Sequence, residues 1–344
     1  MKFGRVNTLA AEGGILSHSI KLPGGKLGKG IRLSGIEIRN LQSAGINEVV
    51  IARLEAGDVG EDEAANRIAC AIAGDNVIAD PAVNGRCNIH AAIGGLLVFD
   101  SGDLIRLNLV DEALTIATLP AWSVVQPDDL LATIKIIPYG VPGQSVTRLV
   151  GTAQETGCRL NVHAFRKLRI GLLQTQVSGL AERILDKTRK VTDRRLGLLG
   201  NEIAVETRCA HHESAIANGI GELLAADCKL ILIAGASASA DRRDVVPQAI
   251  EQAGGHIIHM GMPVEPGNLL LLAEIRQQFP VICLPGCARS PALNGFDWVL
   301  ERLLAGLQVQ AADIMAMGAG GLIKGAPPRI AGPAAKVGDP DGED

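Results

Sequence analysis

The sequence predicts a multidomain α/β protein whose C-terminal domain contains a mostly parallel sheet. Three observations support this prediction. The chain has 344 residues, more than one ordinary hydrophobic core accommodates. Hydrophobic residues make up 47% and charged residues 20% of the chain, which provides enough apolar material for buried sheets. After about residue 168, short apolar runs alternate with longer helical stretches, as is typical of parallel strands joined by right-handed crossovers.

The first unit is predicted to span residues 1–75 and to be a small α/β unit. Glycine turns predict a hairpin, helical periodicity predicts two helices, and an apolar run predicts a buried strand. We expect these elements at residues 14–33, 35–44, 48–52 and 58–72. Asp58 is the candidate N-cap of the second helix, because an aspartate there can accept a hydrogen bond from the first turn.

The second unit, residues 76–165, is predicted to be rich in β-structure. Its apolar segments are short and are separated by turn residues. Strands are expected at residues 94–99, 114–118 and 130–138. Such a pattern occurs in many β folds, so it does not select one of them.

The third unit, residues 166–310, is predicted to be the α/β domain with the parallel sheet. Its strands are expected at residues 168–173, 203–206, 230–234, 256–260 and 280–284. Its helices are expected at residues 182–199, 213–226, 246–252 and 296–305. The remaining residues, 311–344, are rich in Gly, Ala, Pro and Asp and are expected to form a flexible tail.

Composition and charge argue against several classes of protein. A net charge of −4 and an aromatic content of 2% do not favour nucleic-acid binding, which needs basic surfaces or stacking rings. Seven cysteines without a CxxC pair or zinc spacing are expected to be reduced thiols. The sequence has no apolar signal core and no run of eighteen apolar residues, so we expect a cytoplasmic protein that does not enter a membrane.

Three loops are the candidate ligand-binding segments. In an open parallel sheet, ligands bind beyond the carboxyl ends of the strands, where helix N-termini present backbone amides. The loops that follow predicted strands there are 174–187, 235–244 and 285–294. We therefore expect residues of these three loops to converge on one site.

The loop 235–244 has the composition of a phosphate-binding or ring-binding loop. Its candidate binding residues are Gly235, Ala236, Ser237, Ser239 and Asp241. Small side chains let backbone amides approach a ligand closely, and serine adds hydroxyl donors. The alternative is that small residues follow a buried strand only for packing.

Charged residues at two predicted helix starts are the candidate catalytic and metal-binding groups. Arg243 suits bidentate binding of phosphate. Asp186 and Asp244 suit a Mg²⁺ ion held through its waters, but N-capping explains an aspartate at either place equally well.

Two further turn-rich segments contribute candidate binding residues, because stiff loops that are not needed as connections often line sites. These residues are Pro266, Gly267, Pro285, Gly286, Arg289 and Ser290. Cys287 has no neighbouring histidine in sequence, so an inert thiol is favoured over a nucleophile. His211 and His212 are interpreted as surface polar residues rather than metal ligands.

Residues 168–308 resemble the molybdopterin-binding domain shared by molybdopterin adenylyltransferases, molybdopterin molybdotransferases and gephyrin. The resemblance depends on Asp186-Lys187-Thr188, Ala234-Gly235-Ala236-Ser237, Arg243-Asp244-Val245-Val246-Pro247, Met262 with Pro266-Gly267, and Leu284-Pro285-Gly286-Cys287. It implies a three-layer α/β/α domain. It also implies that Gly235, Ser237, Asp186, Asp244 and Gly286 hold the pterin, its phosphate and, in the adenylyltransferases, magnesium nucleotide.

The sequence departs from the family pattern at two positions in these loops. Ala236 stands where the family usually has a second glycine, and Cys287 stands where it usually has asparagine. The Asp-x-Ser-x-Met-Asp-Gly signature of the molybdotransferases has no counterpart. The whole chain resembles bacterial molybdopterin-binding proteins that are sometimes fused to a cytidylyltransferase domain, and that domain is missing from this chain.

Three functional hypotheses remain at this point. The first is a module that binds molybdopterin or molybdenum cofactor and passes it to a cytidylyltransferase or a molybdoenzyme. The second is a Mg²⁺-dependent and ATP-dependent molybdopterin adenylyltransferase, in which Asp186 and Asp244 anchor the metal and Arg243 stabilises the transferred phosphoryl group. The third is an unrelated α/β protein that binds another nucleotide. The resemblance also implies a homo-oligomer.

Overall fold

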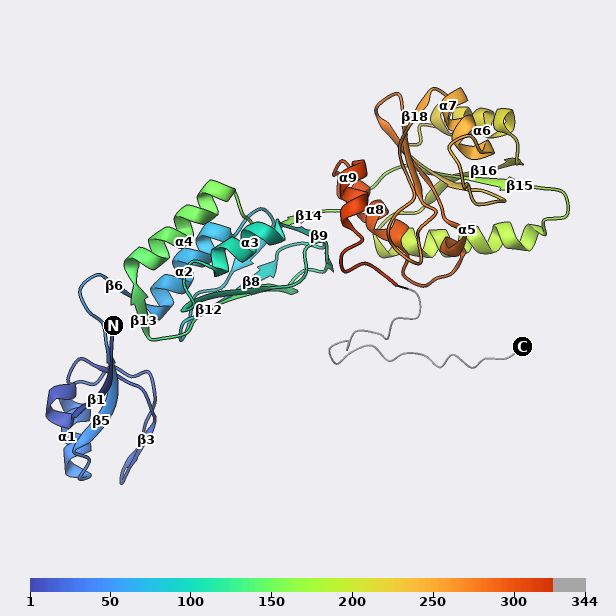
Figure 1. Cartoon of the computed structure of the whole chain (residues 1–344). Coiled ribbons are helices and arrows are strands. Elements are labelled where there is room, and N and C mark those ends of the chain that lie inside the picture. The colour runs from blue at the N-terminus through green and yellow to red at the C-terminus, as the bar shows by residue number, and fades with distance from the viewer. Residues whose placement is uncertain (324–344) are drawn as a thin grey trace. The chain divides into compact units, whose positions relative to one another are not determined.

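The computed structural model describes residues 1–323, which form two compact units (Figure 1). Unit 1 spans Met1–Phe165, and unit 2 begins at Arg166. Each unit contains its own buried apolar side chains. We therefore describe each unit by itself.

Unit 1 opens with a three-stranded antiparallel sheet, a hairpin and a capped helix. The sheet has the order β1-β5-β2, and β3 pairs with β4 in the hairpin. Helix α1 (Gly35–Ser43) is capped reciprocally by Ser34 and Glu37. The other elements are β1 (Lys2–Asn7), η1 (Thr8–Ala11), β2 (Ile15–Leu16), β3 (Ile20–Leu22), β4 (Gly25–Leu27) and β5 (Glu48–Arg53). The predicted hairpin, helix and strand are confirmed.

The second helix of unit 1 begins three residues later than predicted, and the expected N-cap is wrong. Asp58 lies in the short strand β6 (Asp58–Gly60), and Gly60 is the N-cap of α2 (Glu61–Ile72). The Asp58 carboxylate instead accepts from the backbone amide of Glu55 at 2.7 Å and pairs with the N-terminal amine of Met1 at 2.7 Å. Those contacts keep it away from the first turn of the helix.

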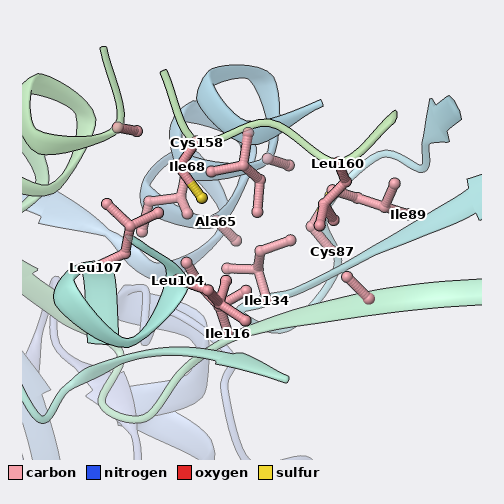
Figure 2. Close-up of a cluster of buried hydrophobic side chains, with 14 of the residues drawn as sticks. Ala65, Ile68, Cys87, Ile89, Leu104, Leu107, Ile116, Ile134, Cys158 and Leu160 are labelled. Atoms are coloured by element: carbon pink, nitrogen blue, oxygen red, sulfur yellow. The ribbon is translucent and has the colours of Figure 1, made fainter. Parts of the chain in front are cut away.

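The rest of unit 1 packs three helices against antiparallel strands. Two of the helices, α3 (Ser101–Asn108) and α4 (Gly143–Thr156), lie within the segment predicted to be β-rich. The strands form the sheets β10-β12-β8-β7, β11-β9-β14 and β13-β6. They are β7 (Val77–Ala79), β8 (Arg86–Ala91), β9 (Gly95–Val98), β10 (Leu114–Thr118), β11 (Val124–Val125), β12 (Leu130–Ile136), β13 (Gly140–Pro142) and β14 (Asn161–His163). Figure 2 shows Ile68, Leu107 and Ile134 in the cluster of apolar side chains that joins helices and strands.

Unit 2 contains a six-stranded sheet with the order β16-β15-β17-β20-β19-β18. The neighbouring strands β16, β15, β17 and β20 are parallel, and only β19 runs against its neighbours. The strands are β15 (Ile170–Gln176), β16 (Ile203–Ala210), β17 (Leu230–Ala234), β18 (Gly255–Met260), β19 (Leu271–Ile275) and β20 (Phe279–Cys283). The mostly parallel sheet is confirmed, whereas β19 was not predicted.

Helices cover both faces of this sheet, with α6 and α7 on one face and α5 and α8 on the other (Figure 1). They are α5 (Glu182–Leu198), α6 (Glu213–Ala225), α7 (Val245–Gln252) and α8 (Gly295–Leu304). The segment expected to be a flexible tail begins with a short helix, α9 (Ala311–Ala316), in which Ile314 is buried. The part of that tail from residue 324 onward lies outside the described residues.

Candidate functional site

Loops at one edge of the unit 2 sheet form the candidate site. The parallel strands β15, β17 and β20 end at Gln176, Ala234 and Cys283. Because the strands are parallel, the loops that follow them leave the sheet at the same edge. The loops after β17 and β20 contribute most of the residues described below.

A small hollow, with a cavity volume of about 30 Å³, lies between these two loops. Its lining residues are Thr188, Ala234, Gly235, Ser237, Ala238, Leu284, Pro285, Gly286, Ala288 and Arg289. A smaller hollow, of about 10 Å³, shares Gly235, Ser237, Ala238 and Leu284 and adds Ser239. The structure therefore brings together the candidates Gly235, Ser237, Ser239, Pro285, Gly286 and Arg289.

The loop after β17 has a turn that only glycine fits. A Cβ at Gly235 would lie 2.6 Å from the backbone oxygen of Ser237. The next backbone amide, that of Ala236, donates to Thr175 Oγ1 at 2.7 Å. This bond engages the Ala236 amide with the protein itself, so the amide of Ala236 is a weaker candidate for ligand binding than the residues that line the hollow.

Thr175 holds this loop through a hydrogen bond and is itself in contact with His211. The sequence did not predict a role for either residue. Thr175 is fully buried, and its Oγ1 lies 2.8 Å from His211 Nδ1. His211 is half-buried, and its ring is part of a hydrogen-bonded chain that ends on the Ala236 amide. His212 does pair at the surface, with Glu213. No sequence motif marks the Thr175 contact, since it joins residues 36 positions apart.

Arg289 joins the two loops that form the hollow. Its Nη2 donates to the backbone oxygen of Gly235 at 2.8 Å, and its side chain also lines the hollow. A guanidinium has five N–H donors, so the others can bind an anion. Gly286, on the same loop, has no atom within 4 Å of an added Cβ, which shows that its Cα faces open space.

Asp186 does not line the hollow. Its carboxylate is 65% exposed and pairs with Arg208 at 2.6 Å. Arg208 also pairs with Glu206 at 2.6 Å and Glu182 at 3.4 Å, and its hydrogen bonds to Asp186 and Glu206 raise the pKa of its guanidinium. Thr188, two residues further along the same motif, lines the hollow instead.

The charged residues at the start of α7 are engaged with one another and with the helix. Asp244 is the N-cap of α7, and its carboxylate accepts from the amides of Val245 at 2.8 Å and Ala240 at 3.2 Å. Arg243 is 88% exposed and pairs with Asp241 at 2.9 Å, a contact that lowers the pKa of Asp241. None of the three lines the hollow.

Pro266, Gly267 and Ser290 support the loops rather than line the hollow. The Pro266 oxygen accepts from the Gly295 amide at 2.9 Å. A Cβ at Gly267, whose φ is 137°, would lie 2.8 Å from the Gly295 nitrogen, so this turn packs directly against the start of α8. The hydroxyl of Ser290 accepts from the Ala292 amide at 3.3 Å.

The residues present do not fit a Mg²⁺ site made by Asp186 and Asp244, because Arg208 holds the first carboxylate and a helix cap holds the second. Within residues 1–323, no group of three or more His, Cys, Asp or Glu side chains is placed to hold a metal ion. Over the same residues, no helix combines the length and apolar character that crossing a membrane requires.

Comparisons with known proteins identify the domain that carries this site. A family described as "Probable molybdopterin binding domain" matches residues 171–305. A comparison with curated proteins finds no match. A solved structure titled "Putative molybdenum cofactor biosynthesis protein from Corynebacterium diphtheriae" is 13% identical with a TM-score of 0.29, over 42% of this chain and 99% of that one. Another from Pyrococcus furiosus is 11% identical with a TM-score of 0.24, over 90% of this chain and 66% of that one.

The family match covers the sheet from β15 to β20 and the helix α8, and it therefore includes the loops that form the hollow. Residues 171–305 are therefore similar to the family described as a probable molybdopterin binding domain.

Proposed function

We propose that the chain binds molybdopterin or molybdenum cofactor in the hollow at the sheet edge and hands it on during cofactor biosynthesis or delivery. The observation that carries this proposal is the convergence of Gly235, Ser237, Gly286 and Arg289 from two loops within the matched domain. The hollow offers hydroxyl and guanidinium donors beside open backbone. Such a set suits the phosphate and the polar edge of a pterin.

The fit of molybdopterin is supported by two features of the hollow. A Cβ at Gly286 would meet no atom within 4 Å, so a ligand atom can approach the backbone there. Arg289 supplies a cation at the wall and retains N–H donors beyond the one that Gly235 accepts. In this assignment Arg289 binds the phosphate, and Ser237 with the backbone of Gly286 binds its remaining oxygens or the pterin edge.

The contacts that Asp186 and Asp244 make within the protein favour binding and delivery over adenylyl transfer. Asp186 is paired with Arg208, and Asp244 caps α7. Adenylyl transfer through these residues would require Asp186 to leave its cation and Asp244 to leave its helix. Holding and releasing a ligand at the hollow requires neither change.

The experiment that separates the two functions is anaerobic calorimetric titration of the full chain with molybdopterin, with and without magnesium ATP, while nucleotide products are measured. The proposal predicts saturable binding that magnesium ATP leaves unchanged, without transfer of AMP. Transfer of AMP to molybdopterin would establish the adenylyltransferase instead. Absence of binding would refute both.

A further inference from the structure

Arg195 of α5 is buried beneath the loop that follows β20, far along the chain from the residues it contacts. Only 8% of the residue is exposed. One guanidinium nitrogen, Nη1, pairs with Asp297 Oδ2 at 2.5 Å. The other, Nη2, donates to the backbone oxygens of Ser290 and, at 2.7 Å, Ala292. The guanidinium also lies over the ring of Phe296, 5.1 Å from its centroid.

The partner of Arg195 extends this contact to the other side of the loop. Asp297 Oδ2 accepts from the backbone amide of Asn294 at 2.9 Å. The Asn294 side chain, which is almost fully buried, donates through Nδ2 to the sulfur of Cys287 at 3.0 Å. Arg195 thus holds the loop directly, at residues 290 and 292. Its partner Asp297 holds the loop at residue 287 through Asn294.

The segment held in this way forms one wall of the hollow. The short helix η2 (Gly286–Arg289) contributes Gly286, Ala288 and Arg289 to the lining. Arg289 in turn reaches the oxygen of Gly235 on the opposite loop. A series of contacts therefore runs from Arg195 through the loop after β20 to Gly235.

We propose that Arg195 is a positioning residue of the ligand site. Its guanidinium holds the loop after β20 in its binding geometry through Nη1 and Nη2. The proposal rests on the proposed function, because the hollow is its ligand site. An arginine is needed because Nη1 and Nη2 bind a carboxylate and two carbonyl oxygens in different directions at once. A lysine retains the charge beside Asp297 but, as a single compact donor group, does not hold the same three oxygens in the fork geometry.

Arg195→Lys is the test variant, because it keeps the buried positive charge and removes the fork. The adjacent Arg194 is exposed, so Arg194→Lys is the matched control for the same chemical change on the same helix. Ile216→Val, on the buried face of α6, is the control for a general loss of stability. All three are made in the full chain.

Two readouts decide the proposal. Hydrogen exchange of residues 285–294 should become at least about tenfold faster in Arg195→Lys, while exchange in β15 and β17 changes little. Affinity for molybdopterin, measured anaerobically by calorimetry, should fall by at least about tenfold. The loop of the variant must become ordered when the ligand binds, and the free energy that this ordering costs reduces the binding free energy. Both control variants should keep the affinity of the wild type. The reactivity of the exposed Cys287 with iodoacetamide, relative to the exposed Cys70, reports the same loosening.

An Arg195→Lys protein that binds molybdopterin as tightly as the wild type overturns the proposal, as does unchanged exchange in residues 285–294. An equal loss of affinity in Ile216→Val overturns it too, because the effect would then follow stability alone. Failure of the proposed function is distinguishable, since in that case the wild type itself does not bind molybdopterin.

Discussion

Replacing Gly235 with alanine tests the loop after β17 most sharply. The added Cβ would lie 2.6 Å from the backbone oxygen of Ser237, whereas real Cβ atoms essentially never approach within 3.0 Å. The oxygen must therefore retreat by at least 0.4 Å, the difference between these two distances. Because the obstructing atom belongs to the backbone, no side-chain rotation can relieve the contact. The loop itself has to move.

The movement has two measurable consequences. Overpacking of this kind costs about 1–3 kcal/mol of folding free energy. For a unit of this size that corresponds to a decrease in Tm of roughly 2–12 °C. The shift also displaces the Gly235 oxygen that Arg289 binds, so affinity for molybdopterin should fall by at least about tenfold.

Calorimetry of the full chain measures both quantities, and two other glycines provide controls. A Cβ at Gly286 meets nothing within 4 Å, so Gly286→Ala should leave Tm unchanged yet weaken molybdopterin binding, because its methyl group enters the hollow. Gly24→Ala, in unit 1, should change neither. A Gly235→Ala protein with the Tm and the affinity of the wild type would refute the reasoning.

Three further predictions concern charged residues of unit 2. Asp244→Ala should lower stability by about 1 kcal/mol through loss of the N-cap, and Asp244→Asn should not, as measured by urea denaturation; equal stability of the two variants would contradict capping. Burial raises the pKa of Glu301 to about 8, so its protonated form is favoured in the folded state. The unfolding free energy should therefore fall by roughly 2–4 kcal/mol as pH rises from 4.5 to 8, and the same pH dependence in Glu301→Gln would disprove this origin. Arg289→Ala should weaken molybdopterin binding by about tenfold or more and reduce its salt dependence, whereas Arg243→Ala, whose side chain is exposed, should change affinity less than about twofold. Equal losses in these two arginine variants, measured by titration at two salt concentrations, would contradict the assignment of Arg289 to the site.

The sheet of unit 2 was largely predictable because its strands and helices follow local patterns. The run at residues 230–234 is apolar throughout and is completely buried as β17. The glycine that follows it, Gly235, marks the turn that the structure requires. Strand β19 escaped prediction because it is the one strand that runs against its neighbours, between two turn-rich segments without a helical crossover.

The partners of the charged residues were not predictable, because they come from distant parts of the chain. Asp186 suggests a metal ligand from its place at a helix start, yet its partner is Arg208 on the neighbouring strand. Thr175 and His211 belong to no motif and meet only when β15 pairs with β16. Residue types and spacing predicted which edge of the sheet carries the candidate site. Long-range pairing decides which side chains at that edge remain available to a ligand.

The most direct test of the central claim is hydrogen exchange of the full chain, anaerobically, with and without saturating molybdopterin. Ligand in the hollow should slow exchange of backbone amides in residues 235–240 and 284–290 and leave unit 1 unaffected. Protection confined to unit 1, or no protection anywhere in the chain, would contradict the claim that the loops after β17 and β20 bind molybdopterin.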